Sequence, residues 1–81
     1  MYLHLGGQTV VKERDIVAIL DLETTSVSKK TKEFFKINEK NGLMENISED
    51  IPKSYIICNE NGNTKIYISQ ISSATLLKRT E

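Results

Sequence analysis

The longest unbroken run of aliphatic residues in the chain is Ile16–Leu20, and Leu22 extends it after one charged position. The run is rich in β-branched residues and shorter than a typical helix, so it predicts a strand within residues 14–22. Charged residues close it on both sides, from Arg14 at one end to Asp21 at the other. In a chain this small, so much apolar surface is expected to be buried on both faces, in the core or against another subunit.

A second apolar pattern occupies residues 54–69, where two segments are separated by Asn61-Gly62. Asn-Gly is the preferred pair of a two-residue type I′ turn, because both central residues need a positive φ. The pattern therefore predicts an antiparallel hairpin in which Ile57 lies opposite Ile66.

This register sorts the hairpin side chains onto two faces. One face, expected to be core, carries Tyr55, Ile57, Ile66 and Ile68. The other carries Ile56, Cys58 and Tyr67 beside Lys65. The second face is too apolar for full exposure, so we expect it to meet a partner.

The two ends of the chain carry shorter signals. Residues 2–5 and 9–11 predict a small hairpin around a glycine pair. Ser72 is a good N-cap for a short C-terminal helix within residues 72–79.

The middle of the chain predicts one longer helix over residues 29–40. Ser28 is its expected N-cap, and Asn41-Gly42 is expected to stop it because glycine suits the left-handed C-cap position. Residues 43–52 are expected to form an acidic loop. The order of elements predicts a single α+β domain over residues 1–81, mainly antiparallel sheet with one central helix and a short C-terminal helix.

Length and cysteine usage favour assembly. Below about 80 residues a single core is only marginally stable without disulfides, a metal or oligomerisation. Cys58 is the only cysteine, which excludes a disulfide within the chain, and with His4 as the only other soft ligand a zinc site is not expected. Homo-oligomerisation is therefore the expected route. No signal peptide or membrane-spanning run is present, which predicts a cytoplasmic protein without a membrane partner.

The residue types that catalysis needs do not occur together. Gly6-Gly7 lacks the further glycines and the Lys-Ser/Thr pair of a phosphate loop, and His4 has no nucleophile near it in sequence. We expect no enzymatic activity, no cofactor, no metal and no small-molecule substrate.

Charge is balanced but unevenly distributed. Eleven basic and eleven acidic side chains give a formal net charge of zero, which argues against a typical nucleic-acid binder. Yet Lys29, Lys32, Lys36 and Lys40 fall within an arc of about 80° on one face of the expected helix. Such a stripe is either an ordinary solvated face or a surface that meets phosphates.

Two further cations lie at expected sheet edges. Arg14 opens the apolar strand, where it can pair with Glu13 or Asp15 or contact phosphate through its planar donor fork. Lys53 follows Pro52, whose ring restricts the backbone just before the hairpin.

Three blocks of the sequence carry a resemblance to a known family: MYLHLGG at the start, VVKERDIVAILDLET in the central strand and YISQISSATLLKR near the end. With these blocks the chain resembles the RemA/RemB family of bacterial extracellular-matrix (biofilm) regulators, and is nearer to RemB than to RemA. Residues 27–53 match weakly.

The resemblance implies a DNA-binding transcriptional regulator with a mainly β fold similar to LytTR-type DNA-binding domains, assembled into rings. It places Arg14 where the family carries an arginine implicated in DNA binding. Lys53 lies, by a looser correspondence, in a loop where RemA is rich in arginine. This sequence departs from RemA there, because it carries the acidic residues Glu49 and Asp50.

The resulting hypothesis is a homo-oligomeric regulator that contacts DNA mostly through the backbone. Arg14 and Lys53 are the principal candidates for phosphate contacts, and Lys29, Lys32 and Lys36 are the weaker ones. The alternative is a protein–protein assembly module that does not touch DNA.

Overall fold

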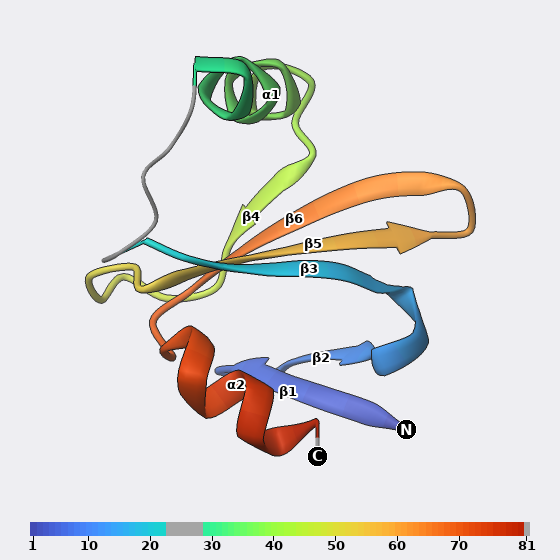
Figure 1. Ribbon diagram of the computed structural model, residues 1–81, viewed down its shortest axis with the longest axis vertical. Coiled ribbons are helices and arrows are strands. Elements are labelled where there is room, and N and C mark those ends of the chain that lie inside the picture. Colours follow the sequence, from blue (N-terminus) through green and yellow to red (C-terminus); the bar gives the residue numbers. More distant parts are fainter. Residues whose placement is uncertain (23–28, 81) are drawn as a thin grey trace.

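A computed structural model describes residues 1–22 and 29–80, apart from the side chains of residues 29–32. In chain order its elements are β1 (Tyr2–Gly6), β2 (Thr9–Lys12), the 3₁₀ turn η1 (Glu13–Asp15), β3 (Ile16–Asp21), α1 (Lys29–Lys40), β4 (Met44–Asn46), β5 (Ser54–Glu60), β6 (Asn63–Ser69) and α2 (Ser73–Arg79). They form a four-stranded sheet of order β3-β5-β6-β4 and a two-stranded sheet of β1 and β2. Figure 1 shows α1 on one side of the larger sheet and both β1–β2 and α2 on the other. The expected α+β class with mostly antiparallel pairing is confirmed.

The β5–β6 hairpin forms in the expected register. Asn61 and Gly62 adopt φ values of 55° and 84°, the positive angles that a type I′ turn requires. Ile57 pairs with Ile66, as the alternation of apolar residues predicted.

The expectation that the second hairpin face needs an outside partner was wrong. The side chains of this face, Ile56, Cys58 and Tyr67, are buried in the main core of the same chain. The side chains that cover them within the same chain are Leu3, Leu5 and Val11 from the β1–β2 hairpin and Leu76 from α2. Both faces of the β5–β6 hairpin are apolar in sequence. The β1–β2 hairpin, which is distant in sequence, packs on one of them and so determines which face is fully buried.

The opposite face of the sheet is less completely buried. Ile66 is fully buried there, whereas Tyr55, Ile57 and Ile68 are half-buried. The Phe35 ring of α1 packs on this face, with its centroid 4.5 Å from that of Tyr55.

The helix α1 has the expected bounds, and Gly42 follows it with a φ of 72°. Its expected cap, Ser28, lies outside the described residues. The loop predicted for residues 43–52 was wrong in part, because Met44–Asn46 forms β4 and pairs in parallel with β6. A three-residue strand has no alternation to reveal it, and its partner comes later in the chain.

The short helix α2 begins as expected, since the Ser72 side chain accepts a hydrogen bond from the Thr75 backbone N–H. At its other end the Arg79 Nη1 donates to the His4 carbonyl oxygen at 3.0 Å, which ties α2 to β1.

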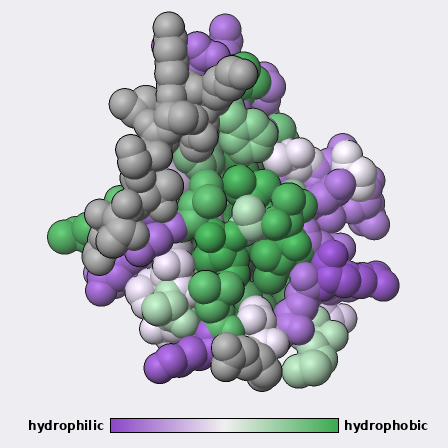
Figure 2. All heavy atoms as spheres, viewed as in Figure 1, coloured by the Kyte–Doolittle hydropathy of each residue, from purple (hydrophilic) through white to green (hydrophobic). Residues whose placement is uncertain are grey.

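The apolar run forms β3, the strand that was predicted, but at an edge of the sheet. No residue of Ile16–Asp21 is fully buried, and Val17 is 66% exposed. In the same view as Figure 1, Figure 2 shows apolar side chains gathered over the centre of the molecule, where β3 runs. The expected burial on both faces is therefore not reached within one copy of the chain.

Candidate nucleic-acid interface

Arg14 sits on the η1 turn that carries the chain from the small sheet to the large one. Hydrogen bonds hold the turn at both ends: the Glu13 N–H donates to the Met1 carbonyl oxygen at 3.0 Å, and the Ile16 N–H donates to the Glu13 carbonyl oxygen. Arg14 itself is exposed. Its backbone is thus fixed while its guanidinium faces solvent.

No ion pair neutralises this arginine within the described part of the chain. Glu13 and Asp15, the two partners that the sequence offered, do not pair with it. The guanidinium therefore keeps its donors available for an external anion.

A hollow of about 270 Å³ lies beside the turn, lined by Met1, Tyr2, Lys12 and Arg14. It brings together two exposed cations, Lys12 from the end of β2 and Arg14 from η1. Sequence reasoning missed Lys12. The available signal was its spacing, because residues two positions apart across a tight turn can face the same side.

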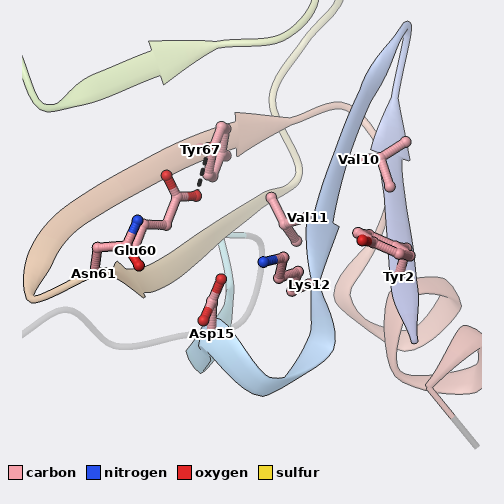
Figure 3. A pocket seen from close by; sticks show the side chains of 8 residues that line it. All are labelled: Tyr2, Val10, Val11, Lys12, Asp15, Glu60, Asn61 and Tyr67. Atoms are coloured by element: carbon pink, nitrogen blue, oxygen red, sulfur yellow. Dashed lines mark hydrogen bonds between the residues drawn. The ribbon is translucent and has the colours of Figure 1, made fainter.

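A second hollow of about 300 Å³ adjoins the first and shares Tyr2 and Lys12 with it. Figure 3 shows its walls: Lys12 and Asp15 on the β2–η1 side, and Glu60 and Tyr67 on the β5–β6 hairpin. The Tyr67 hydroxyl donates to the Glu60 carboxylate at 2.7 Å. The carboxylates of this second hollow would repel a phosphate, so they limit anion binding to the side of Arg14.

The side chains beneath this hollow keep their protons to high pH. Burial, and then the hydrogen bond to Glu60, raise the pKa of Tyr67 well above its usual value. Burial, followed by the carboxylates of Glu60 and Asp15, raises the pKa of the Cys58 thiol to about 11. Cys58 is thus an inert thiol of the core, and not a reactive one.

Lys53 lies at the other end of β3. Its N–H donates to the Ser69 carbonyl oxygen at 2.8 Å, and its carbonyl oxygen accepts from the Leu22 N–H at 3.0 Å. The backbone is fixed and the side chain is exposed. The length of β3, about 17 Å at the usual strand rise, separates it from Arg14. These two principal candidates cannot bind one phosphate together.

The helix lysines form a third location. Lys36 is exposed on α1, which lies on the opposite side of the larger sheet from the β1–β2 hairpin and α2 (Figure 1). The side chains of Lys29 and Lys32 lie outside the described residues, so the structure places only their backbone in α1. Arg14 and Lys12 line the same hollow. The other candidates whose side chains are described, Lys53 and Lys36, do not line it.

Among residues 1–22 and 29–80, no cluster of His, Cys, Asp or Glu side chains is arranged to hold a metal ion. The helices in that part of the chain are too short or too polar to span a bilayer.

These features define a small α+β protein whose most distinctive exposed chemistry is a pair of cations at a fixed turn. A model of the RemA-like family, extracellular matrix regulatory protein A-like, matches residues 2–80. Extracellular matrix regulatory protein B of Bacillus subtilis (strain 168) is 38% identical over 81 residues, which make up 100% of this chain and 91% of that relative. The chain belongs to the RemA-like family of extracellular-matrix regulatory proteins, and the resemblance stated from its sequence is confirmed.

Proposed function

We propose that this chain is a non-enzymatic, DNA-binding transcriptional regulator of extracellular-matrix (biofilm) genes that acts in the cytoplasm as a homo-oligomeric ring. The observation that carries the proposal is the hollow where Arg14 and Lys12 stand together at a rigid turn. Membership of a family of matrix regulatory proteins supplies the biological context.

The site chemistry favours phosphate. The guanidinium of Arg14 can donate two parallel hydrogen bonds to phosphate oxygens, and the ammonium of Lys12 adds a point charge beside it. Because both cations border one hollow, they can meet one phosphate or two neighbouring ones. Most contacts would then go to the DNA backbone, which positions a protein on the duplex without reading its sequence.

Assembly reconciles DNA binding with a formal net charge of zero. The phosphate contribution to affinity depends on how many cations reach one duplex, because each neutralised phosphate releases counterions. A ring that repeats the Arg14 turn would present several pairs of cations to the same DNA. Lys53, Lys36, Lys29 and Lys32 remain secondary candidates that such an assembly could bring to the duplex.

The test is salt-dependent binding to a long duplex, measured for the wild type, Arg14→Ala and the control Lys78→Ala. Lys78 is an exposed cation of α2 that lines neither hollow. Affinity should fall by orders of magnitude between about 50 and 200 mM salt if each assembly makes several phosphate contacts. Arg14→Ala should weaken binding and flatten the salt slope, whereas Lys78→Ala should do neither. Affinity that ignores salt, or that Arg14→Ala leaves unchanged, rules out the phosphate site.

A second candidate function is a protein–protein assembly module that acts without DNA. It is favoured by Glu49 and Asp50, which are exposed just before Lys53 and place negative charge beside that cation. An intact oligomer that retards no duplex at micromolar concentration would select this function.

A further inference from the structure

The β1–β2 hairpin is a two-stranded ribbon with one buried face and one open face. Its inner side chains belong to the main core. The open face carries Tyr2, His4 and Val10, which are all exposed, Tyr2 by 68% and Val10 by 52%. Figure 3 shows Tyr2 and Val10 together on one side of the ribbon, whereas Val11 points toward the β5–β6 hairpin. The open face is therefore available to a partner outside the chain.

The ribbon stands apart from the larger sheet. Among the described strands, β1 and β2 pair only with each other, and Figure 1 shows them at the end of the molecule opposite α1. Neighbouring strands lie about 5 Å apart, and the major groove of B-DNA is about 12 Å wide, so a two-stranded ribbon with its side chains fits that groove. The minor groove, at about 6 Å, is too narrow to admit it.

The ribbon carries no negative side chain. Residues 1–12 contain no aspartate or glutamate, although the whole chain has eleven acidic side chains. The carboxylates nearest in the structure's second hollow, those of Asp15 and Glu60, lie toward the β5–β6 hairpin and not on the open face (Figure 3). The open face can therefore approach a polyanion without a repelling charge on its own strands.

The open face adjoins the phosphate site of the proposed function. Tyr2 pairs with Lys12 in the ribbon register, and both line the hollow that Arg14 borders. A strand rises about 3.4 Å per residue, so the next outward pair along the ribbon lies roughly 7 Å away, or about two base-pair steps. A phosphate held by Arg14 thus leaves the open face beside the bases of the same stretch of duplex.

The next outward pair consists of His4 and Val10, which are direct register partners. The His4 Nε2 lies 2.8 Å from the Gly7 carbonyl oxygen. Because a carbonyl oxygen only accepts, Nε2 is the donor, and the neutral ring keeps Nδ1 as an acceptor. Val10 sets two methyl groups about 5 Å away across the strands. The pair thus presents an acceptor beside an apolar group.

An A·T pair carries the complementary pattern in the major groove. Its edge there includes the adenine N6 amino donor and the thymine C5-methyl group, whereas a G·C pair has an amino donor but no methyl. An acceptor and an apolar group held side by side therefore match A·T better than G·C.

We propose that the β1–β2 ribbon enters the major groove of a duplex held at the Arg14–Lys12 hollow and favours A·T pairs there. His4 accepts from the adenine N6 amino group, and Val10 contacts the thymine methyl. This inference rests on the DNA binding of the proposed function and adds base readout to its backbone contacts.

The test compares an alternating A·T duplex with the same duplex in which uracil replaces thymine, which removes only the C5-methyl group. The wild type should bind the thymine duplex at least roughly fourfold more tightly, as expected for one buried methyl contact. Val10→Ser should bind the two duplexes about equally. The control Val17→Ser, at a 66% exposed valine of β3, should discriminate like the wild type.

Every protein in this comparison meets the same two duplexes, so any effect of the methyl group on DNA shape cancels. Val10 is 52% exposed, so its variant should fold, and circular dichroism checks this. Equal affinity of the wild type for both duplexes overturns the inference, as does a thymine preference that Val10→Ser retains in full.

A third duplex, of inosine·cytosine pairs, separates the two grooves. It presents the major-groove pattern of G·C but the minor-groove pattern of A·T, because inosine lacks the guanine N2 amino group. The wild type should bind A·T more tightly than inosine·cytosine, and equal affinity for the two overturns major-groove readout.

His4→Phe keeps a ring without an acceptor. It should weaken binding to the A·T duplex several-fold and retain the preference for thymine over uracil, because Val10 is unchanged. Wild-type affinity in His4→Phe overturns the role of His4. A wild type that binds every duplex equally well, with the expected salt dependence, contradicts only this inference, whereas a wild type that binds no duplex contradicts the proposed function as well.

Discussion

Arg14 illustrates what the structure adds to a single residue. From sequence it could equally pair with Glu13 or Asp15 or bind an anion, since all three residues are adjacent. On the 3₁₀ turn the arginine is exposed and forms no ion pair with either carboxylate, and it borders a hollow with Lys12. The turn geometry therefore decides between the two readings.

Lys12 should behave as a partner of Arg14. We expect Lys12→Ala to weaken duplex binding several-fold at low salt and to reduce the salt slope by about one for each copy engaged, as removal of one phosphate contact should. Titrations at several salt concentrations measure both quantities. Lys12→Arg retains the charge and serves as the control. A salt slope equal to that of the wild type would mean that Lys12 faces the duplex without contacting it.

Cys58 should make stability fall at alkaline pH. Burial, then Glu60 and Asp15, raise the pKa of its thiol from 9.0 to about 11. Below pH 9 the thiol is protonated in both states, so its contribution is fully present. Between pH 9 and 11 the unfolded chain loses the proton while the folded chain keeps it, so the free energy of unfolding falls as pH rises, by roughly 2 kcal/mol in total.

Urea unfolding of the wild type and of Cys58→Ala at a series of pH values between about 8 and 11 checks this. The variant loses a constant amount of packing energy at every pH but has no thiol to titrate. The wild type should therefore approach the variant in stability as pH rises. Parallel pH profiles for the two proteins would contradict the raised pKa.

At the scale of elements, local signals predicted best. The Asn61-Gly62 turn and the alternation beside it fixed the β5–β6 register, because both lie within a few residues of each other. The bounds of α1 and the cap of α2 follow from equally local chemistry. Structure that depends on distant segments was missed.

Two misses share that cause. The strand β4 exists only because β6, about 20 residues later, lies beside it. The sealed face of the hairpin depends on where β1–β2 packs, and nothing near Ile56 or Cys58 in the sequence reports it. The hollow beside η1 was predicted only in part. Arg14 was a candidate from the sequence, whereas Met1 and Tyr2, which line the hollow from the start of the chain, were not.

The hairpin turn gives a direct test of an element. Gly62 has a φ of 84°, and a Cβ added there would meet no atom within 4 Å. The cost of Gly62→Ala is therefore purely conformational, and we expect it to lower the free energy of unfolding by about 1 kcal/mol. Urea denaturation measures the change. Asn63→Ala, at the next exposed position, should stay within about 0.5 kcal/mol. An equal loss of unfolding free energy in both variants would contradict the view that glycine is needed at position 62 for its left-handed backbone.

At the scale of the whole molecule, the cations are dispersed. Arg14 and Lys12 lie at one end of β3, Lys53 lies at the other, and Lys36 lies on the opposite layer. The molecule measures 31 × 29 × 23 Å, and these cations lie on different parts of its surface. With a formal net charge of zero, a single copy has little long-range attraction for DNA.

DNA affinity should therefore rise with duplex length by more than the increase in the number of binding sites alone would give. A duplex of about one helical turn engages one copy. A duplex of several turns meets neighbouring copies of the assembly, whose binding then becomes intramolecular. We expect the affinity per site and the magnitude of the salt slope to rise together, because each further copy releases its own counterions. Fluorescence anisotropy with labelled duplexes of increasing length measures both quantities. Equal affinity per site at every length would mean that each copy binds alone, and assembly would then have no part in DNA recognition.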